Sequence, residues 1–151
     1  MAVDIALEGF PARTSDKIRY GDTDRQGHVN NAVFATFLET GRVEILHGAG
    51  DSLADPGTAF VIARLVLDFR AEVTWPGEVT IGTRVAAIGR SSVKLEQALF
   101  QNGKCVATAE TTIVQVDGAT RRSRSLSQPA RDRLAAFSAP SPQSELSPRG
   151  E

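Results

Sequence analysis

The period at which apolar residues recur changes from helical to strand-like along this chain. Between Asn30 and Gly48 the apolar positions fall three and four residues apart, which places them on one face of an amphipathic helix. Asn30 is a residue type that caps helix N-termini, and Gly48 is a type that follows a last helical turn. The pattern therefore predicts a helix from about residue 30 to residue 47. Its apolar stripe contains Val33, Phe34, Phe37, Leu38, Gly41, Ile45 and Leu46.

Beyond this helix apolar and polar residues alternate with a period of two, which is typical of half-buried strands. Asn102-Gly103 is the clearest turn signal, because a type I′ hairpin turn needs positive φ at both central residues. Trp75-Pro76-Gly77 and Gly89-Arg90-Ser91-Ser92 also interrupt the alternation. Strands joined by successive tight turns are expected to pair in order as an antiparallel sheet. They are predicted at 59–70, 79–87, 93–99 and 105–116, with a further short strand at 17–20.

The two ends of the chain carry weaker patterns. Residues 1–15 show little periodicity and are predicted to form a loose arm. Residues 127–137 predict a short helix with Pro129 near its start. The tail, residues 138–151, has four Ser, three Pro and one large apolar residue, so we predict that it is disordered. The expected organisation is one domain over residues 1–137 followed by this tail.

Composition and charge exclude several classes of protein. Hydrophobic residues make up 41% of the chain, which suits a globular domain with its own core. The formal net charge of −1 gives no electrostatic reason to expect a nucleic-acid or membrane partner. Cys105 is the single cysteine, which excludes an intrachain disulfide and favours a reducing compartment. No apolar run is long enough to span a bilayer and no signal-peptide pattern is present, so a cytoplasmic location is predicted.

The segment just before the predicted helix concentrates side chains that suit catalysis. Two acids, a histidine and two amides lie within ten residues, at Asp22, Asp24, His28, Asn30 and Asn31. At a helix N-terminus the free N–H groups and the helix dipole can polarise a substrate carbonyl. Each side chain also has a structural alternative, because acids in such loops form Asx-turns or caps and a histidine can satisfy the loop backbone.

The chain resembles the hotdog-fold acyl-CoA thioesterases of the broad 4-hydroxybenzoyl-CoA thioesterase-like family over roughly residues 15–137. The resemblance rests on Asp24, on Gly27-His28-Val29-Asn30-Asn31, and on Glu39 within the helix that follows. It implies an α+β hotdog fold, in which an antiparallel five-stranded sheet wraps around one long central helix. It also implies hydrolysis of acyl-CoA thioesters by a homodimer or homotetramer, with active sites at the subunit interface.

The same resemblance assigns roles to individual residues. The acid at the position of Asp24 is the catalytic carboxylate of the family, acting as a base on water or as a nucleophile. The backbone amide of Asn31 would face the thioester oxygen. His28 and Glu39 are candidates for orienting substrate or water. Candidates for binding CoA or the acyl group are Arg90, Ser91, Ser92, Phe34 and Ile62.

Alternatives to these roles stay open at the level of sequence. Arg90 and its neighbours could form a plain hairpin turn, and Glu39 could form an ion pair with Arg42 or Arg64. The substrate could be an acyl-carrier protein, or the chain could bind acyl-CoA or an acyl carrier without turnover. No metal ion or other cofactor is expected. A calcium-loop pattern starting at Asp22 fails where a bidentate glutamate is required.

Overall fold

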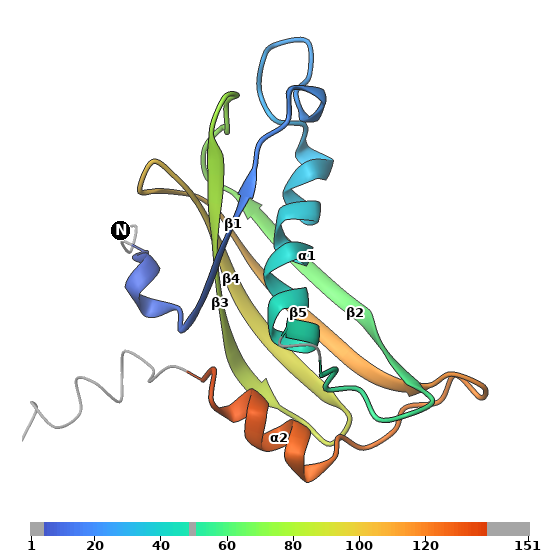
Figure 1. Ribbon diagram of the computed structural model, residues 1–151. Coiled ribbons are helices and arrows are strands. Elements are labelled where there is room, and N and C mark those ends of the chain that lie inside the picture. Colours follow the sequence, from blue (N-terminus) through green and yellow to red (C-terminus); the bar gives the residue numbers. More distant parts are fainter. Residues whose placement is uncertain (1–4, 49–50, 139–151) are drawn as a thin grey trace, which may run out of the picture.

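A curved sheet packed on one long helix forms most of the molecule (Figure 1). The structure is a computed structural model and describes residues 5–48 and 51–138. Its five strands are antiparallel and wrap around helix α1, which confirms the predicted α+β architecture. The elements are β1 (Ala12–Lys17), α1 (Asn31–His47), β2 (Thr58–Phe69), β3 (Glu78–Ile88), β4 (Ser92–Gln101), β5 (Lys104–Asp117) and α2 (Gln128–Ala135), with 3₁₀ turns η1 (Leu7–Gly9) and η2 (Tyr20–Asp22).

The strand order is β1-β3-β4-β5-β2, and it corrects one prediction. Hairpins join β3 to β4 and β4 to β5, as expected. The expected pairing of β2 with β3 is wrong, because β2 pairs with β5 at the far edge of the sheet. Residues 70–77 therefore cross one end of the sheet instead of making a hairpin turn. Apolar alternation locates a strand but carries no information about its neighbours.

The polar strand β1 corrects a second prediction. Residues 12–17 pair with β3, from Ala12 opposite Thr83 to Lys17 opposite Glu78, where a loose arm was expected. Residues 18–20 do not continue this strand. The sequence ARTSDK contains one apolar residue, so it has no alternation to detect. One of its inward positions contacts α1 through a polar group, since the Thr40 hydroxyl donates to Asp16 Oδ2 at 3.0 Å.

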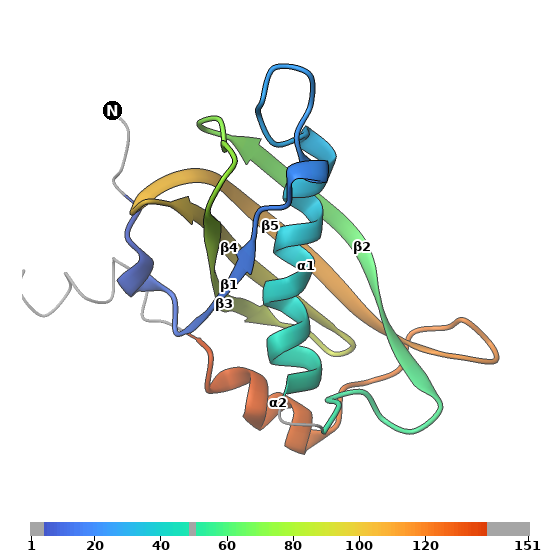
Figure 2. The same ribbon diagram turned by 45° about the horizontal axis from the view of Figure 1, so that its top comes forward.

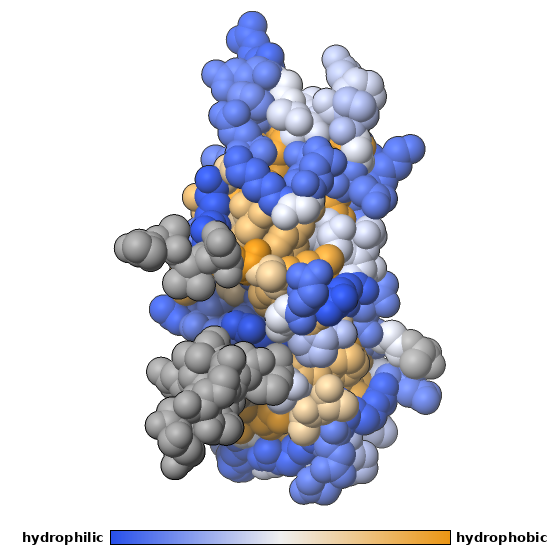
Figure 3. All heavy atoms as spheres, turned by 90° about the vertical axis from the view of Figure 1, so that its left-hand side faces the viewer, coloured by the Kyte–Doolittle hydropathy of each residue, from blue (hydrophilic) through white to orange (hydrophobic). Residues whose placement is uncertain are grey.

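The segment before β1 covers the face of the sheet opposite α1. Phe10 is buried against Gly82, where an added Cβ would lie 2.7 Å from Phe10 Cγ. The Arg84 guanidinium lies 5.0 Å from the centre of the Phe10 ring and its Nε donates to Glu96 at 2.8 Å. Figure 3 views the molecule from the η1 side, and apolar residues gather in the middle of this face between hydrophilic ends.

The main core lies between α1 and the sheet and depends on a close approach at Gly41. A Cβ at this position would lie 2.5 Å from Ile81 Cγ2 and 2.9 Å from Thr83 Oγ1. Beside it, Gln97 Nε2 donates to the Leu38 carbonyl at 3.0 Å and ties β4 to the helix backbone. Other fully buried residues of this core include Phe37, Val79, Leu95 and Leu99.

The predicted helix ends and the Asn-Gly turn are confirmed. Asn30 caps α1, with its Oδ1 accepting from Ala32 N at 2.9 Å, and Gly48 follows the last residue of the helix. Asn102 and Gly103 have φ of 53° and 79°, which a type I′ turn requires. The predicted helix at 127–137 is α2, which packs at the end of the sheet near the last turns of α1 (Figure 2).

The predicted disordered tail, residues 138–151, lies outside the described residues apart from Ser138. The boundary of the domain at residue 137 stays a prediction. Within residues 5–48 and 51–138 no helix is both long and apolar enough to cross a membrane.

Candidate active site

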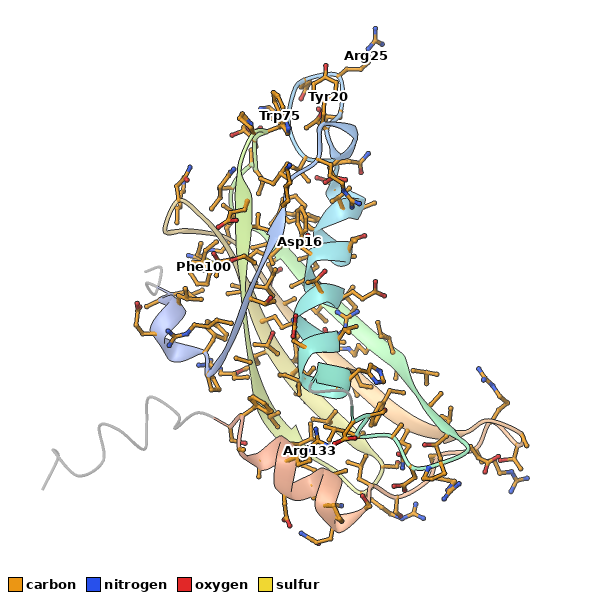
Figure 4. All side chains as sticks on the ribbon, viewed as in Figure 1. Asp16, Tyr20, Arg25, Trp75, Phe100 and Arg133 are labelled. Carbon is orange, nitrogen blue, oxygen red and sulfur yellow. The ribbon has the colours of Figure 1, made fainter. Side chains whose placement is uncertain are left out.

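Two segments far apart in sequence meet beyond the N-terminal end of α1. The loop that precedes the helix is tied to the crossing segment after β2, since Val29 N donates to Val73 O at 2.8 Å. Tyr20 and Trp75 stack edge to face with ring centres 5.3 Å apart, and Figure 4 shows both at this end of the molecule. Arg25 points outward at the tip of the loop. The crossing segment therefore supports the loop that carries the predicted catalytic acid.

Asp24 uses one carboxylate oxygen to hold this loop. Its Oδ1 accepts from Gln26 N at 2.8 Å and from His28 N at 3.2 Å, and its own N–H donates to His28 O at 2.8 Å. The Asx-turn considered as an alternative is thus present. The second oxygen, Oδ2, accepts no hydrogen bond from any described residue. One carboxylate oxygen is therefore held by the loop backbone, and the other is left without a partner among the described residues.

Asp22 has the structural role considered for it. Its Oδ2 accepts from Arg19 N at 2.8 Å, and its side chain is almost completely buried. Its backbone oxygen accepts from Asn30 N at 2.8 Å, which places the cap of α1. Asp22 therefore shapes the entry of the chain into the helix.

The first turn of α1 leaves one amide free. Asn30 accepts from Ala32 N with its side chain and from Val33 N with its carbonyl, at 2.9 Å each. No described acceptor takes the N–H of Asn31. A free N–H at the first position of a helix carries the positive end of the helix dipole. It is suited to stabilise negative charge that develops on a bound carbonyl oxygen.

A cavity of about 400 Å³ brings the predicted residues together. Asp24, His28, Asn31 and Phe34 line it from the loop and the first turn of α1. The opposite wall comes from the end of β2 and the crossing segment. Phe34 stacks edge to face on Phe69 there, with ring centres 5.0 Å apart. No sequence motif indicated this wall, which consists of Phe69, Arg70, Ala71 and Glu72.

His28 meets one of the residues that the sequence did not indicate. Its Nε2 lies 3.0 Å from Glu72 Oε2 across the cavity, and its side chain is about one third exposed. Glu72 lies more than forty positions after His28 and belongs to no motif. The pairing of β2 with β5 determines where this wall lies, and periodicity does not reveal that pairing.

The turn with Arg90, Ser91 and Ser92 lies away from this cavity within one copy of the chain. It follows β3, whereas the cavity lies beyond the start of that strand. The eleven residues of β3 span roughly 35 Å at about 3.3 Å per residue. Gly89 N donates to Ser92 O at 2.7 Å, and Arg131 of α2 donates to the Gly89 carbonyl at 2.8 Å. The turn has the hairpin geometry considered as its alternative.

Glu39 and Ile62 also lie outside the cavity. Glu39 is exposed on α1 and forms an ion pair with neither Arg42 nor Arg64 among the described side chains. Arg64 pairs with Glu110 instead, at 3.2 Å. Ile62 is 50% exposed on β2. Neither residue contributes to the cavity within one copy, and their predicted roles stay predictions.

The thiol of Cys105 is poorly suited to act as a nucleophile. Burial raises the pKa of this thiol, and the nearby Arg70 lowers it by less. A raised pKa reduces the thiolate fraction at neutral pH. The described residues contain no group of three or more His, Cys, Asp or Glu side chains placed to share a metal ion.

Asp24 and Asn31, each with a polar group that has no partner among the described residues, line one cavity together with Phe34 and Phe69. A carboxylate and a helix-terminal amide beside aromatic side chains suit acyl transfer. Comparison with known families agrees with this class. The sequence model of the thioesterase-like superfamily matches residues 18–140, and the chain belongs to this superfamily. Its fold is the hotdog fold that the sequence resemblance implied.

Individual relatives share the same architecture. A Thermus thermophilus thioesterase, solved in complex with coenzyme A and zinc, is 34% identical with a TM-score of 0.75, covering 86% of this chain and 96% of that one. The long-chain acyl-CoA thioesterase FadM of Escherichia coli is 28% identical, over 81% of this chain and 96% of its own. The chloroplastic acyl-acyl carrier protein thioesterase ATL2 of Arabidopsis thaliana is 29% identical over 72% of this chain. This chain spans about 60% of that plant relative's length.

Proposed function

We propose that this protein hydrolyses acyl-CoA thioesters to the free acid and CoA. The observation that carries the proposal is the cavity at the start of α1, which Asp24 and Asn31 both line. The free Oδ2 and the free N–H are the two groups that thioester hydrolysis needs. The similarity to the long-chain acyl-CoA thioesterase FadM, and to a Thermus thermophilus thioesterase solved with coenzyme A, supports this substrate class.

In the proposed reaction the substrate carbonyl oxygen accepts a hydrogen bond from the Asn31 N–H. Asp24 either removes a proton from an attacking water or attacks the carbonyl carbon itself. The carbon–sulfur bond breaks and the CoA sulfur leaves as a thiolate, which needs no strong general acid. In the direct-attack route the mixed anhydride formed on Asp24 is then hydrolysed by water, which releases the acid and restores the carboxylate. In either route the proton taken from water ends on the CoA sulfur. His28, held by Glu72 at 3.0 Å, borders the cavity and is proposed to orient the substrate.

The proposed functional unit is a homodimer formed through β2, and two such dimers would make the tetramer that is the alternative assembly. Among the described strands β2 pairs only with β5, so its other edge is open in that part of the chain. Ile62, Leu65 and Phe69 remain substantially exposed along it. A long apolar edge of this kind is a template for pairing with another strand. Antiparallel pairing of two β2 strands across a two-fold axis closes both open edges.

This dimer would also bring the turn at residues 90–92 close to the cavity of the other copy. In one copy the turn at 90–92 lies at the opposite end of the sheet from Asp24. Because the two-fold axis reverses the second copy, its turn lies at the same end of the joined sheet as the first copy's Asp24. The proposed role of Arg90, Ser91 and Ser92 in binding CoA is therefore a role across the interface. The predicted cytoplasmic location remains part of this proposal.

A panel of thioesters tests the activity. We expect thiol release from acyl-CoA substrates, measured with a thiol-reactive dye across aliphatic and aromatic acyl groups. Acyl-carrier-protein substrates belong in the same panel, because the similarity to ATL2 favours them as the second candidate. Acyl-CoA binding without thiol release from any substrate would contradict hydrolysis and identify a binding protein.

The cap of α1 provides a test of the Asn31 amide. Asn30→Ala removes the acceptor for Ala32 N, so the first turn should fray and the Asn31 N–H should lose its position. We expect a loss of about 1 kcal/mol in stability and a fall in kcat. Ser127→Ala is the matched control, because Ser127 caps α2 by accepting from Ala130 N. It should cost similar stability and leave kcat unchanged; equal kcat in both variants would count against the amide.

A further inference from the structure

Arg42 is a buried cation without a counterion in the described chain. The residue as a whole is only 5% exposed, and the Nη1 atom of its guanidinium has no hydrogen-bond partner. No described carboxylate lies within ion-pair distance of it. Burial lowers the pKa of the guanidinium, and Glu39 opposes this only from a distance. Burying a charge without a counterion is unfavourable, so an anion beside this side chain would stabilise it.

The neutral groups near the helix do not meet this need. The other buried side-chain atoms without a partner in the described chain are Gln97 Oε1 and Thr111 Oγ1. Both belong to the strands below α1, and both are uncharged. Hydrogen bonds to neutral oxygens would solvate the guanidinium without neutralising it. An anionic group would neutralise it, and a carboxylate is the anionic side chain that a protein supplies.

The position of Arg42 on the helix shows where such a carboxylate can come from. Thr40 faces β1, since its hydroxyl donates to Asp16. At about 100° per residue, Arg42 lies roughly 200° around the axis from Thr40, on the flank directed toward β2. Glu39 lies about one turn earlier and within roughly 60° of Arg42, on the same flank. Glu39 is exposed there and pairs with no described cation.

We propose that Arg42 receives the Glu39 carboxylate of a second copy of this chain. This inference rests on the dimer proposed above. In a two-fold contact residue i meets residue j and j meets i. Residues 39 and 42 lie at and just after the middle of α1, which runs from Asn31 to His47. Two α1 helices that run antiparallel about an axis near this midpoint exchange two ion pairs, and both buried guanidinium groups are neutralised.

Charge reversal with mixing tests this pairing. Glu39→Arg and Arg42→Glu are expressed separately with different tags, and dimerisation is measured by analytical ultracentrifugation. Each variant alone places like charges across the axis, so its dimer dissociation constant should rise about tenfold or more. In a mixed dimer each introduced charge meets its opposite in the other copy. The mixture should therefore form a heterodimer about as tight as the wild-type dimer. Where one variant is insoluble alone, co-expression and sequential purification on both tags gives the same readout.

The design separates a pair between copies from a pair within one copy. Within either variant positions 39 and 42 carry like charges, so an intrachain pair gains nothing from mixing. Arg84→Glu with Glu96→Arg is the matched control, because this ion pair joins β3 to β4 within one chain and lies away from β2. Weakened dimers without recovery on mixing, or single variants that dimerise normally, would overturn the proposal. A monomeric wild-type chain would overturn the dimer itself, while thiol release is measured independently of either result.

Discussion

Asp24→Asn is expected to lower kcat by about 10²–10⁴-fold, the range attributed to a positioned acid or base. The substitution is nearly isosteric, and its amide oxygen can still accept from Gln26 N and His28 N. The loop should therefore keep its shape. What disappears is the free carboxylate oxygen that would activate water or attack the thioester. Steady-state thiol release, together with thermal unfolding and the mass of the particle in solution, measures the effect.

The neighbouring acid supplies the control for this prediction. Asp22→Asn removes a carboxylate from the same loop, but its remaining oxygen can still accept from Arg19 N. Turnover should stay within a few fold of wild type. If Asp24→Asn keeps full turnover, or if both variants lose it equally, Asp24 is not the reacting carboxylate. A single turnover in water that carries a heavy oxygen isotope then distinguishes activation of water from direct attack by Asp24. Isotope found in the Asp24 carboxylate supports direct attack.

Gly41→Ala is expected to destabilise the fold by about 2 kcal/mol, within the range for overpacked cores. The new methyl group would meet Ile81 Cγ2 at 2.5 Å and Gln97 Nε2 at 2.8 Å. Moving Gln97 aside would break its hydrogen bonds to Leu38 O and Thr83 Oγ1. The strain should exceed the gain of about 1 kcal/mol that alanine brings to a helix interior. Urea unfolding at fixed protein concentration measures the difference.

Gly48→Ala is the comparison at the end of the same helix. A Cβ at Gly48 would lie 3.7 Å from Glu44 Oε2, an ordinary contact with a flexible side chain. Its stability should match that of the wild type within about 0.5 kcal/mol, as for most surface substitutions. A Gly41→Ala protein as stable as Gly48→Ala would mean that α1 does not depend on this close approach to β3.

Local signals in the sequence were enough to predict α1 and the last hairpin. A capping asparagine, an apolar stripe and an Asn-Gly pair each act within a few residues, so no tertiary information is needed. The polar strand β1 had no such signal. Its sequence ARTSDK pairs with β3 because that edge of the sheet is available, and Thr40 provides a polar partner for Asp16.

The candidate site also contains residues that local sequence signals predict and residues that they do not. Asp24, His28 and Asn31 belong to one continuous motif, and the cavity brings them together with Phe34. Phe69 and Glu72 complete the cavity from a segment more than thirty positions later in the chain. Their place depends on β2 lying beside β5, and no periodic pattern encodes which strands are neighbours. The position of Arg42 in the helix places it on the buried face. The absence of a counterion among the described residues becomes visible only in the fold.

The position of β2 also bears on the order in which the molecule assembles. The hairpins β3–β4 and β4–β5 join residues close in sequence, whereas Thr58 of β2 pairs with Asp117 of β5. Contacts between distant residues require closure of a long loop and tend to form late during folding. Phe69 and Glu72 reach the cavity only when β2 has docked. The pocket is therefore expected to be among the last parts to form, so intermediates that already contain most of the sheet would still lack a complete substrate site.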